Sequence, residues 1–187
     1  MNIANKLTIL RILMIPLFMF VLESGNNAWF FWLSFRDAQF LATIIFVLAS
    51  FTDFLDGFLA RKLNLITDFG KLMDPLADKI LVMTALIYLV TYGLIPAWVV
   101  IIIFAREFII SGIRMVAASY NIVIAASVWG KLKTVSQMSM IVVLLLSFGA
   151  SAGFLLFGDI LVYLSAGLTI ISLIEYIFAN RQVFKKI

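Results

Sequence analysis

The sequence contains no cysteine and no histidine, and only three of its 187 residues are proline. Without cysteine, the chain can form neither a disulfide framework nor a thiolate metal site. Without histidine it lacks the commonest general base, so any acid–base step must use carboxylates, lysine or tyrosine. Charged residues are also scarce, at 13%. These absences exclude disulfide-stabilised proteins and cysteine–histidine metal sites.

The composition that remains is strongly apolar. Hydrophobic residues make up 64% of the chain and the mean hydropathy is +1.14, which is typical of a membrane protein. We expect one all-α integral membrane domain over residues 1–187, with a short N-terminal interfacial helix at Met1–Lys6. Each apolar run is close to the roughly 20 residues that cross a bilayer. Six transmembrane helices are therefore predicted, at Leu7–Leu22, Ala38–Arg61, Leu72–Tyr92, Ala97–Tyr120, Thr134–Phe148 and Phe154–Phe178, with Asn121–Lys133 as the linker before the fifth.

The positions of lysine and arginine predict the orientation of these helices. A net charge of +4 could suggest nucleic-acid binding, but all 14 basic residues except Arg36 fall on one side of the predicted membrane. Positive residues mark the cytoplasmic side. We therefore expect a multi-pass protein of the cell (inner) membrane, with both termini in the cytoplasm and no nucleic-acid partner.

Four aspartates stand close together in this apolar chain. On a helix, Asp53 and Asp56 share one face with Gly57 and Ala60, and on the next helix Gly70, Asp74 and Asp78 share another. A short turn over Lys62–Phe69 would bring the two faces together. The alternative is a set of separate capping or interfacial acids, which the regular spacing of the small residues disfavours.

Such a cluster requires a compensating charge. One acid at the centre of a membrane helix is unfavourable by roughly 2.5–3.5 kcal/mol, and four like charges repel one another. Oxygen ligands suit Mg²⁺ or Mn²⁺. The cluster therefore predicts a divalent-metal site on the cytoplasmic side.

The segment Asp53–Asp78 reads Asp-x2-Asp-Gly-x2-Ala-Arg-x8-Gly-x3-Asp-x3-Asp. It resembles the signature of the CDP-alcohol phosphotransferases, integral membrane enzymes of phospholipid synthesis. The resemblance implies two divalent ions, a homodimer, and Asp78 as general base as well as ligand. The implied metal ligands are Asp53, Asp56, Asp74 and Asp78, and the residues that bind the CDP-diacylglycerol donor are Asn5, Thr8, Gly57, Ala60, Arg61 and Thr67.

The entrance residues also have a simpler interpretation. Asn5, Thr8 and Arg11 fall at i, i+3 and i+6, which fits an N-cap and a snorkelling arginine as well as a nucleotide contact. Only the resemblance favours the nucleotide contact.

Basic residues follow the acidic segment, at Arg106, Arg114, Lys131 and Lys133. Arg106 and Glu107 could form an intramembrane ion pair, and the others could anchor the linker. Alternatively all four could bind a phosphate monoester, since arginine offers bidentate geometry and lysine a point charge. The pattern Arg106-Glu107-x3-Ser111-x2-Arg114, followed by Gly130-Lys131-x-Lys133-Thr134, resembles the phosphatidylglycerophosphate synthase subfamily. That resemblance implies glycerol 3-phosphate as acceptor and CMP as the leaving product.

Other functions stay open. Within the family the acceptor could be inositol phosphate, serine or phosphatidylglycerol. An intramembrane prenyltransferase also uses Asp-rich motifs with Mg²⁺, but Gly-x2-Ala-Arg would have no role there. A cation or proton transporter would want acids near the bilayer midplane and usually an internal repeat, and this sequence shows neither.

Overall fold

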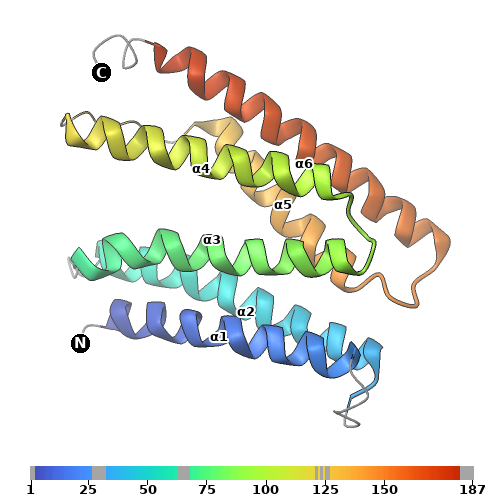
Figure 1. The fold of residues 1–187 in the computed structure, drawn as a ribbon. Helices are drawn as coiled ribbons and strands as arrows, with labels where there is room; N and C mark the ends of the chain where they lie inside the picture. The colour runs from blue at the N-terminus through green and yellow to red at the C-terminus, as the bar shows by residue number, and fades with distance from the viewer. Residues whose placement is uncertain are drawn as a thin grey trace. The chain divides into compact units, whose positions relative to one another are not determined.

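The structure is a computed structural model that describes the backbone of residues 3–26, 33–62, 68–120, 122, 124 and 127–181 (Figure 1). Within these ranges, the side chains of residues 3–6, 26, 53–62 and 68–75 lie outside the description. The described residues form six α-helices: α1 (Ile3–Asn26), α2 (Phe35–Lys62), α3 (Asp68–Thr91), α4 (Ala97–Ser119), α5 (Val128–Leu145) and α6 (Ala152–Ala179).

The prediction of an all-α fold is confirmed for the described residues. Four helical segments in the described part of the chain are long and apolar enough to cross a bilayer: Leu7–Gly25, Phe35–Thr52, Val128–Leu145 and Ala152–Ala179. Only 28% of the residues in the last segment are buried within the protein. A soluble protein rarely exposes such a large apolar surface to water, so this surface is suited to contact with lipid.

The predicted separate helix at Met1–Lys6 is wrong. Residues 3–6 form the first turn of α1, which continues without interruption to Asn26. The physical reason is that no helix-breaking residue occurs before Pro16, which α1 accommodates inside the helix.

The predicted linker Asn121–Lys133 is also too long, because α5 begins at Val128. The Ser127 hydroxyl accepts a hydrogen bond from the Gly130 N–H at 3.1 Å, which satisfies one of the unpaired donors in the first turn of α5. Gly130 and Lys133 are therefore helical residues.

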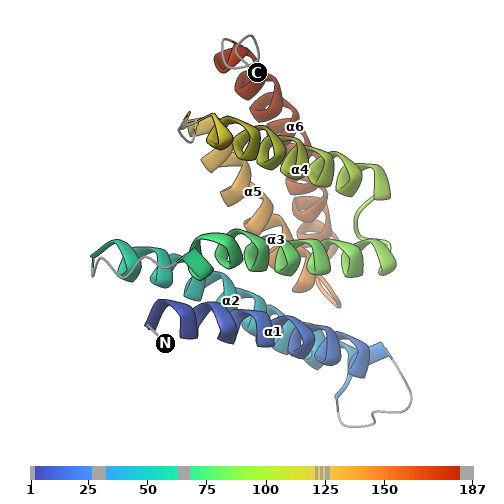
Figure 2. The same cartoon turned by 60° about the vertical axis from the view of Figure 1, so that its left-hand side comes forward.

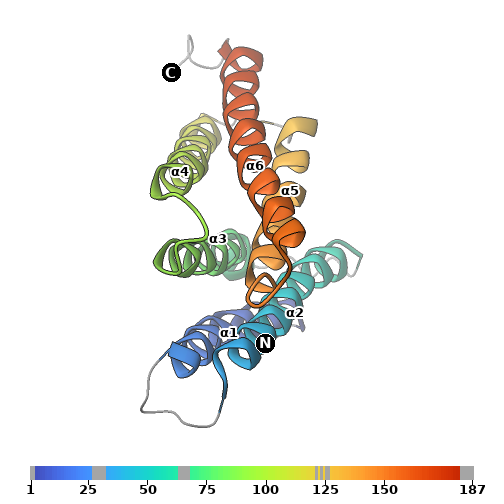
Figure 3. The ribbon, with the colours of Figure 1, turned by 90° about the vertical axis from the view of Figure 1, so that its right-hand side faces the viewer.

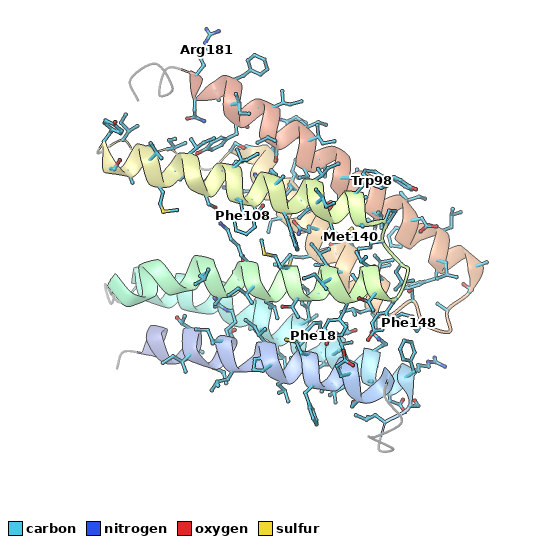
Figure 4. All side chains as sticks on the ribbon, in the orientation of Figure 1. Phe18, Trp98, Phe108, Met140, Phe148 and Arg181 are labelled. Carbon is cyan, nitrogen blue, oxygen red and sulfur yellow. The ribbon has the colours of Figure 1, made fainter. Side chains whose placement is uncertain are left out.

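The chain divides into two compact units. The first holds residues Met1–Leu89 and Val142–Ala150. In it, α2 runs antiparallel to α1 and α3 (Figures 1 and 2). Phe18 of α1 and Phe46 of α2 form a tilted ring contact, with 6.2 Å between centroids, in the apolar core (Figure 4). The Tyr88 hydroxyl of α3 donates to Glu23 of α1 at 3.0 Å. These contacts hold the three helices together.

The second unit holds residues Val90–Ile141 and Ser151–Ile187. Figure 3 shows α6 running beside α4 and α5. The buried face of α6 is lined by small and polar residues, including Ser165, Thr169 and Ser172. Small side chains permit close helix packing within a membrane, and hydroxyls can hydrogen-bond between helices. This polar face meets the charged residues of α4.

Candidate active site

The Asp-rich segment occupies the end of α2 and the beginning of α3. Asp53 and Asp56 are in the last turns of α2, and Asp74 and Asp78 are in the first turns of α3. The helical periodicity assumed from the sequence is therefore present in the backbone. The side chains of Asp53, Asp56 and Asp74 lie outside the described residues.

Asp78 is the member of the set whose side chain is described. It is half-buried, and its neighbour Ala77 is fully buried against the core of the first unit. No group of three or more acidic or other metal-binding side chains occurs among the described residues, since three of the four aspartates are outside them. The donor chemistry of the segment is nonetheless that of hard oxygen ligands, which fits Mg²⁺ or Mn²⁺.

The predicted donor-binding residues lie mostly outside the described side chains. Asn5, Gly57, Ala60 and Arg61 are helical residues whose side chains are not described, and Thr67 is not described at all. Thr8 is described, and only 1% of it is exposed. It lies one helical turn from Arg11, which is fully buried. A guanidinium in an apolar interior requires polar or anionic partners.

A basic cluster lies in the second unit, where α4 meets α5 and α6. Arg106 Nη1 donates to Glu107 Oε1 at 2.8 Å, and Lys133 Nζ donates to the same oxygen at 2.6 Å. The Arg106 and Lys133 side chains are only 11% and 4% exposed. Because two cations share one carboxylate, the cluster carries a net positive charge, and its side chains are largely shielded from solvent.

Two more residues fix the position of Arg106. Its Nε donates to the Ser172 hydroxyl of α6 at 3.1 Å. On the other side, a Cβ placed on Gly130 would lie 3.3 Å from Arg106 Nη2, so the lack of a side chain at Gly130 lets the guanidinium approach α5. The cluster is therefore held from all three helices of the unit.

Arg114 and Lys131 are placed differently. Arg114 lies eight residues beyond Arg106, about 12 Å along α4, and its guanidinium is 5.7 Å from the ring centroid of buried Tyr176. Lys131 is exposed and is two residues from Lys133, so it lies on a different face of α5. The structure thus brings together Arg106 and Lys133, while Arg114 and Lys131 lie outside the Glu107 cluster.

Residues 1–171 match the family model described as CDP-alcohol phosphatidyltransferase. The chain belongs to the CDP-alcohol phosphatidyltransferase family. The matched residues run from α1 into α6, so they include both the Asp-rich segment and the basic cluster of this chain.

Several full-length relatives carry the name CDP-diacylglycerol–glycerol-3-phosphate 3-phosphatidyltransferase. The protein of that name from Bacillus subtilis (strain 168) is 42% identical, and the match covers 98% of this chain and 97% of the relative. The Rickettsia typhi protein is 38% identical, with 98% and 99% covered. The Haemophilus influenzae protein is 39% identical, with 94% and 91% covered.

Sequence reasoning missed two partners in this family member. It considered Glu107 only as a partner of Arg106, and it gave Ser172 no role. The pairing of Glu107 with Lys133 joins residues 26 positions apart, which no local pattern reveals. The spacing of Ser165, Thr169, Ser172 and Tyr176 along one face of an apolar helix was the signal that could have indicated Ser172.

Proposed function

We propose that this chain transfers a phosphatidyl group from CDP-diacylglycerol to glycerol 3-phosphate, giving phosphatidylglycerophosphate and CMP. The observation that carries the proposal is the full-length similarity to relatives with that named activity. The buried basic cluster supports the acceptor assignment, because the phosphate of glycerol 3-phosphate is dianionic whereas serine has no phosphate for such a cluster to bind.

The proposal includes a particular membrane arrangement. All six helices cross the bilayer within one domain, including α3 and α4, and both termini and the Asp-rich segment face the cytoplasm. The distribution of basic residues supports this orientation. Two copies of the chain form a homodimer within this membrane.

Asp53, Asp56, Asp74 and Asp78 hold two divalent cations, Mg²⁺ or Mn²⁺. When bound, these ions would neutralise charge on the pyrophosphate of the donor and increase the acidity of the attacking hydroxyl. The aspartates therefore serve first to place positive charge where the reaction develops negative charge.

The proposed reaction is a substitution at phosphorus. A hydroxyl oxygen of glycerol 3-phosphate forms a bond to the phosphorus that carries diacylglycerol, and the bond from that phosphorus to the bridging oxygen of CMP breaks. The Asp78 carboxylate accepts the hydroxyl proton, since the chain has no histidine to do so. The half-buried position of Asp78 is compatible with a base that water reaches only in part.

The donor binds along the ends of α1 and α2. Asn5, Thr8 and Thr67 contact the nucleotide, and Arg61 meets oxygens of the pyrophosphate. Gly57 and Ala60 lack bulk, which allows a nucleotide to lie against the helix backbone. The acyl chains stay in the lipid.

The acceptor phosphate binds the basic residues of the second unit. Arg106 and Lys133 supply hydrogen bonds to it from a position that Glu107 and Ser172 hold in advance. Such preorganisation reduces the entropy lost on binding. Arg114 and Lys131 contribute from outside this cluster, by charge.

The proposal is tested with purified protein, CDP-diacylglycerol, Mg²⁺ and isotopically labelled glycerol 3-phosphate. We expect label to enter the lipid fraction in a 1:1 ratio with CMP released. Release of CMP without labelled lipid would indicate hydrolysis and would contradict the proposed transfer.

A further inference from the structure

Two hydrogen-bond donors meet at Gly130, in the first turn of α5. A side chain at this position would begin at a point 3.3 Å from Arg106 Nη2 and 3.5 Å from Ser127 Oγ. Apart from the backbone of α5 and the chain neighbours of Gly130, these are the only described atoms within 4 Å of that point. The surface of α5 that the missing side chain leaves open is therefore bordered by a guanidinium nitrogen and a hydroxyl.

Arg106 brings to this point a donor that no described residue accepts. Its Nε donates to Ser172 and its Nη1 donates to Glu107, whereas Nη2 donates to no described residue. Water can still reach Nη2, in contrast to Gln137 Nε2 and the Tyr176 hydroxyl, which are buried without a partner. An anion can therefore meet Nη2 while the other two nitrogens keep their present contacts.

Ser127 brings the second donor. Its Oγ accepts the Gly130 N–H at 3.1 Å, and no described acceptor takes the hydroxyl proton, so this proton is available to a ligand. Two other hydroxyls nearby are already committed. Thr134 donates to the Gly130 carbonyl at 3.0 Å, and Ser172 donates to the Thr169 carbonyl at 3.2 Å. Among these three hydroxyls, the one that can still donate is that of Ser127.

The charge around this point favours an anion as the ligand. Arg106 and Lys133 together outweigh the single charge of Glu107, so the cluster is positive. Lys133 is three residues beyond Gly130 and therefore on the same side of α5. A guanidinium and a hydroxyl both donate well to the oxygens of a phosphate, and a charged acceptor makes each hydrogen bond stronger. The donors at Gly130 thus fit the phosphate of the acceptor.

We propose that Ser127 is a further ligand of the acceptor phosphate. Its hydroxyl donates to one phosphate oxygen while Arg106 Nη2 donates to the same phosphate, and the absence of a side chain at Gly130 lets the phosphate approach α5. Ser127 then has two roles, because its oxygen caps the helix and its proton binds the substrate. The inference rests on the proposed function and adds to it an uncharged ligand outside the set of basic residues.

Two substitutions separate the two roles. Ser127→Ala removes both the cap and the donor, whereas Ser127→Asp keeps an oxygen for the cap but has no proton to donate and repels a phosphate. We expect the KM for glycerol 3-phosphate to rise about tenfold in Ser127→Ala and further in Ser127→Asp, with kcat and the KM for CDP-diacylglycerol changing much less. Ser127→Thr keeps the hydroxyl and should recover most of the affinity.

Ser34→Ala is the matched control. Ser34 caps α2 in the same way, by accepting the N–H of the residue three positions along the chain at 3.2 Å. Loss of either cap should lower the unfolding temperature by about 2–4 °C. Only the loss at Ser127 should also raise the KM for glycerol 3-phosphate.

Three results would overturn the proposal. A raised KM in Ser127→Ala with a normal KM in Ser127→Asp would show that the hydroxyl serves only as a cap. The reverse pattern would show that only an added negative charge matters. A normal KM in both variants would show that Ser127 does not contact the acceptor.

Inorganic phosphate, used as a competitor of glycerol 3-phosphate, shows which part of the acceptor Ser127 meets. Its inhibition constant should rise in Ser127→Ala by the same factor as the KM, and an unchanged constant would overturn the assignment to the phosphate. Absence of turnover in the unaltered protein would instead contradict the proposed function. Ser127 would then be tested by the rise in unfolding temperature with inorganic phosphate, which should be smaller in Ser127→Ala; an equal rise would overturn the proposal.

Discussion

Replacing Lys133 by methionine removes one cation from the Glu107 cluster while keeping a long, flexible side chain. The Lys133 ammonium is almost fully buried and lies 2.6 Å from Glu107 Oε1, and Arg106 remains on the same oxygen in the variant. Glu107 therefore keeps a partner, and the variant should still fold. What it loses is the net positive charge of the cluster.

The size of the effect follows from the contacts. A hydrogen bond between a charged donor and its acceptor contributes about 1.5–3 kcal/mol, or roughly 10- to 150-fold in affinity. Lys133 already has a partner in Glu107, so the phosphate gains only the difference between the two contacts. We expect the KM for glycerol 3-phosphate to rise about tenfold, with kcat and the KM for CDP-diacylglycerol changing much less.

The assay is steady-state CMP release at saturating CDP-diacylglycerol, with glycerol 3-phosphate varied. Arg181→Gln removes an exposed charge outside the cluster and serves as the control. Lys131→Met, which alters an exposed lysine on a different face of α5, should have a smaller effect than Lys133→Met. An unchanged KM for glycerol 3-phosphate in folded Lys133→Met would refute the assignment of Lys133 to the acceptor phosphate.

Three further outcomes are expected. Asp78→Asn should lower kcat at least a hundredfold while CDP-diacylglycerol still binds, because it removes the base; near-normal kcat would exclude Asp78 from that role. Gly130→Ala should raise the KM for glycerol 3-phosphate a few-fold, since the new Cβ would lie 3.3 Å from Arg106 Nη2; an unaltered KM would show that Arg106 can shift without consequence. Chelation of divalent cations should stop CMP release, and Mg²⁺ or Mn²⁺ should restore it; full activity after chelation would contradict the metal assignment.

The helices could largely be predicted because each is a long apolar run, and the positions of their ends were less certain. The linker was predicted to extend to Lys133, yet Ser127 caps α5 and the helix begins at Val128. At the N-terminus, Met1–Lys6 was predicted as a short interfacial helix of its own, although no residue in the first turns of α1 breaks the helix. A change in polarity along the chain therefore does not by itself mark the end of a helix.

The candidate site could likewise be predicted only in part. The spacing of the aspartates on α2 and α3 is local, so the sequence was sufficient to place them on helix faces. The sharing of Glu107 by Arg106 and Lys133 depends on how α4 packs against α5, which one sequence does not encode in any short pattern.

The identity of the acceptor is tested most directly by offering purified protein CDP-diacylglycerol and Mg²⁺ with one acceptor at a time. The acceptors are glycerol 3-phosphate, serine, inositol phosphate and phosphatidylglycerol, and the measurement is CMP release. We predict turnover with glycerol 3-phosphate alone. Turnover with another acceptor and none with glycerol 3-phosphate would contradict the proposed function, while absence of CMP with every acceptor would contradict the phosphatidyl transfer itself.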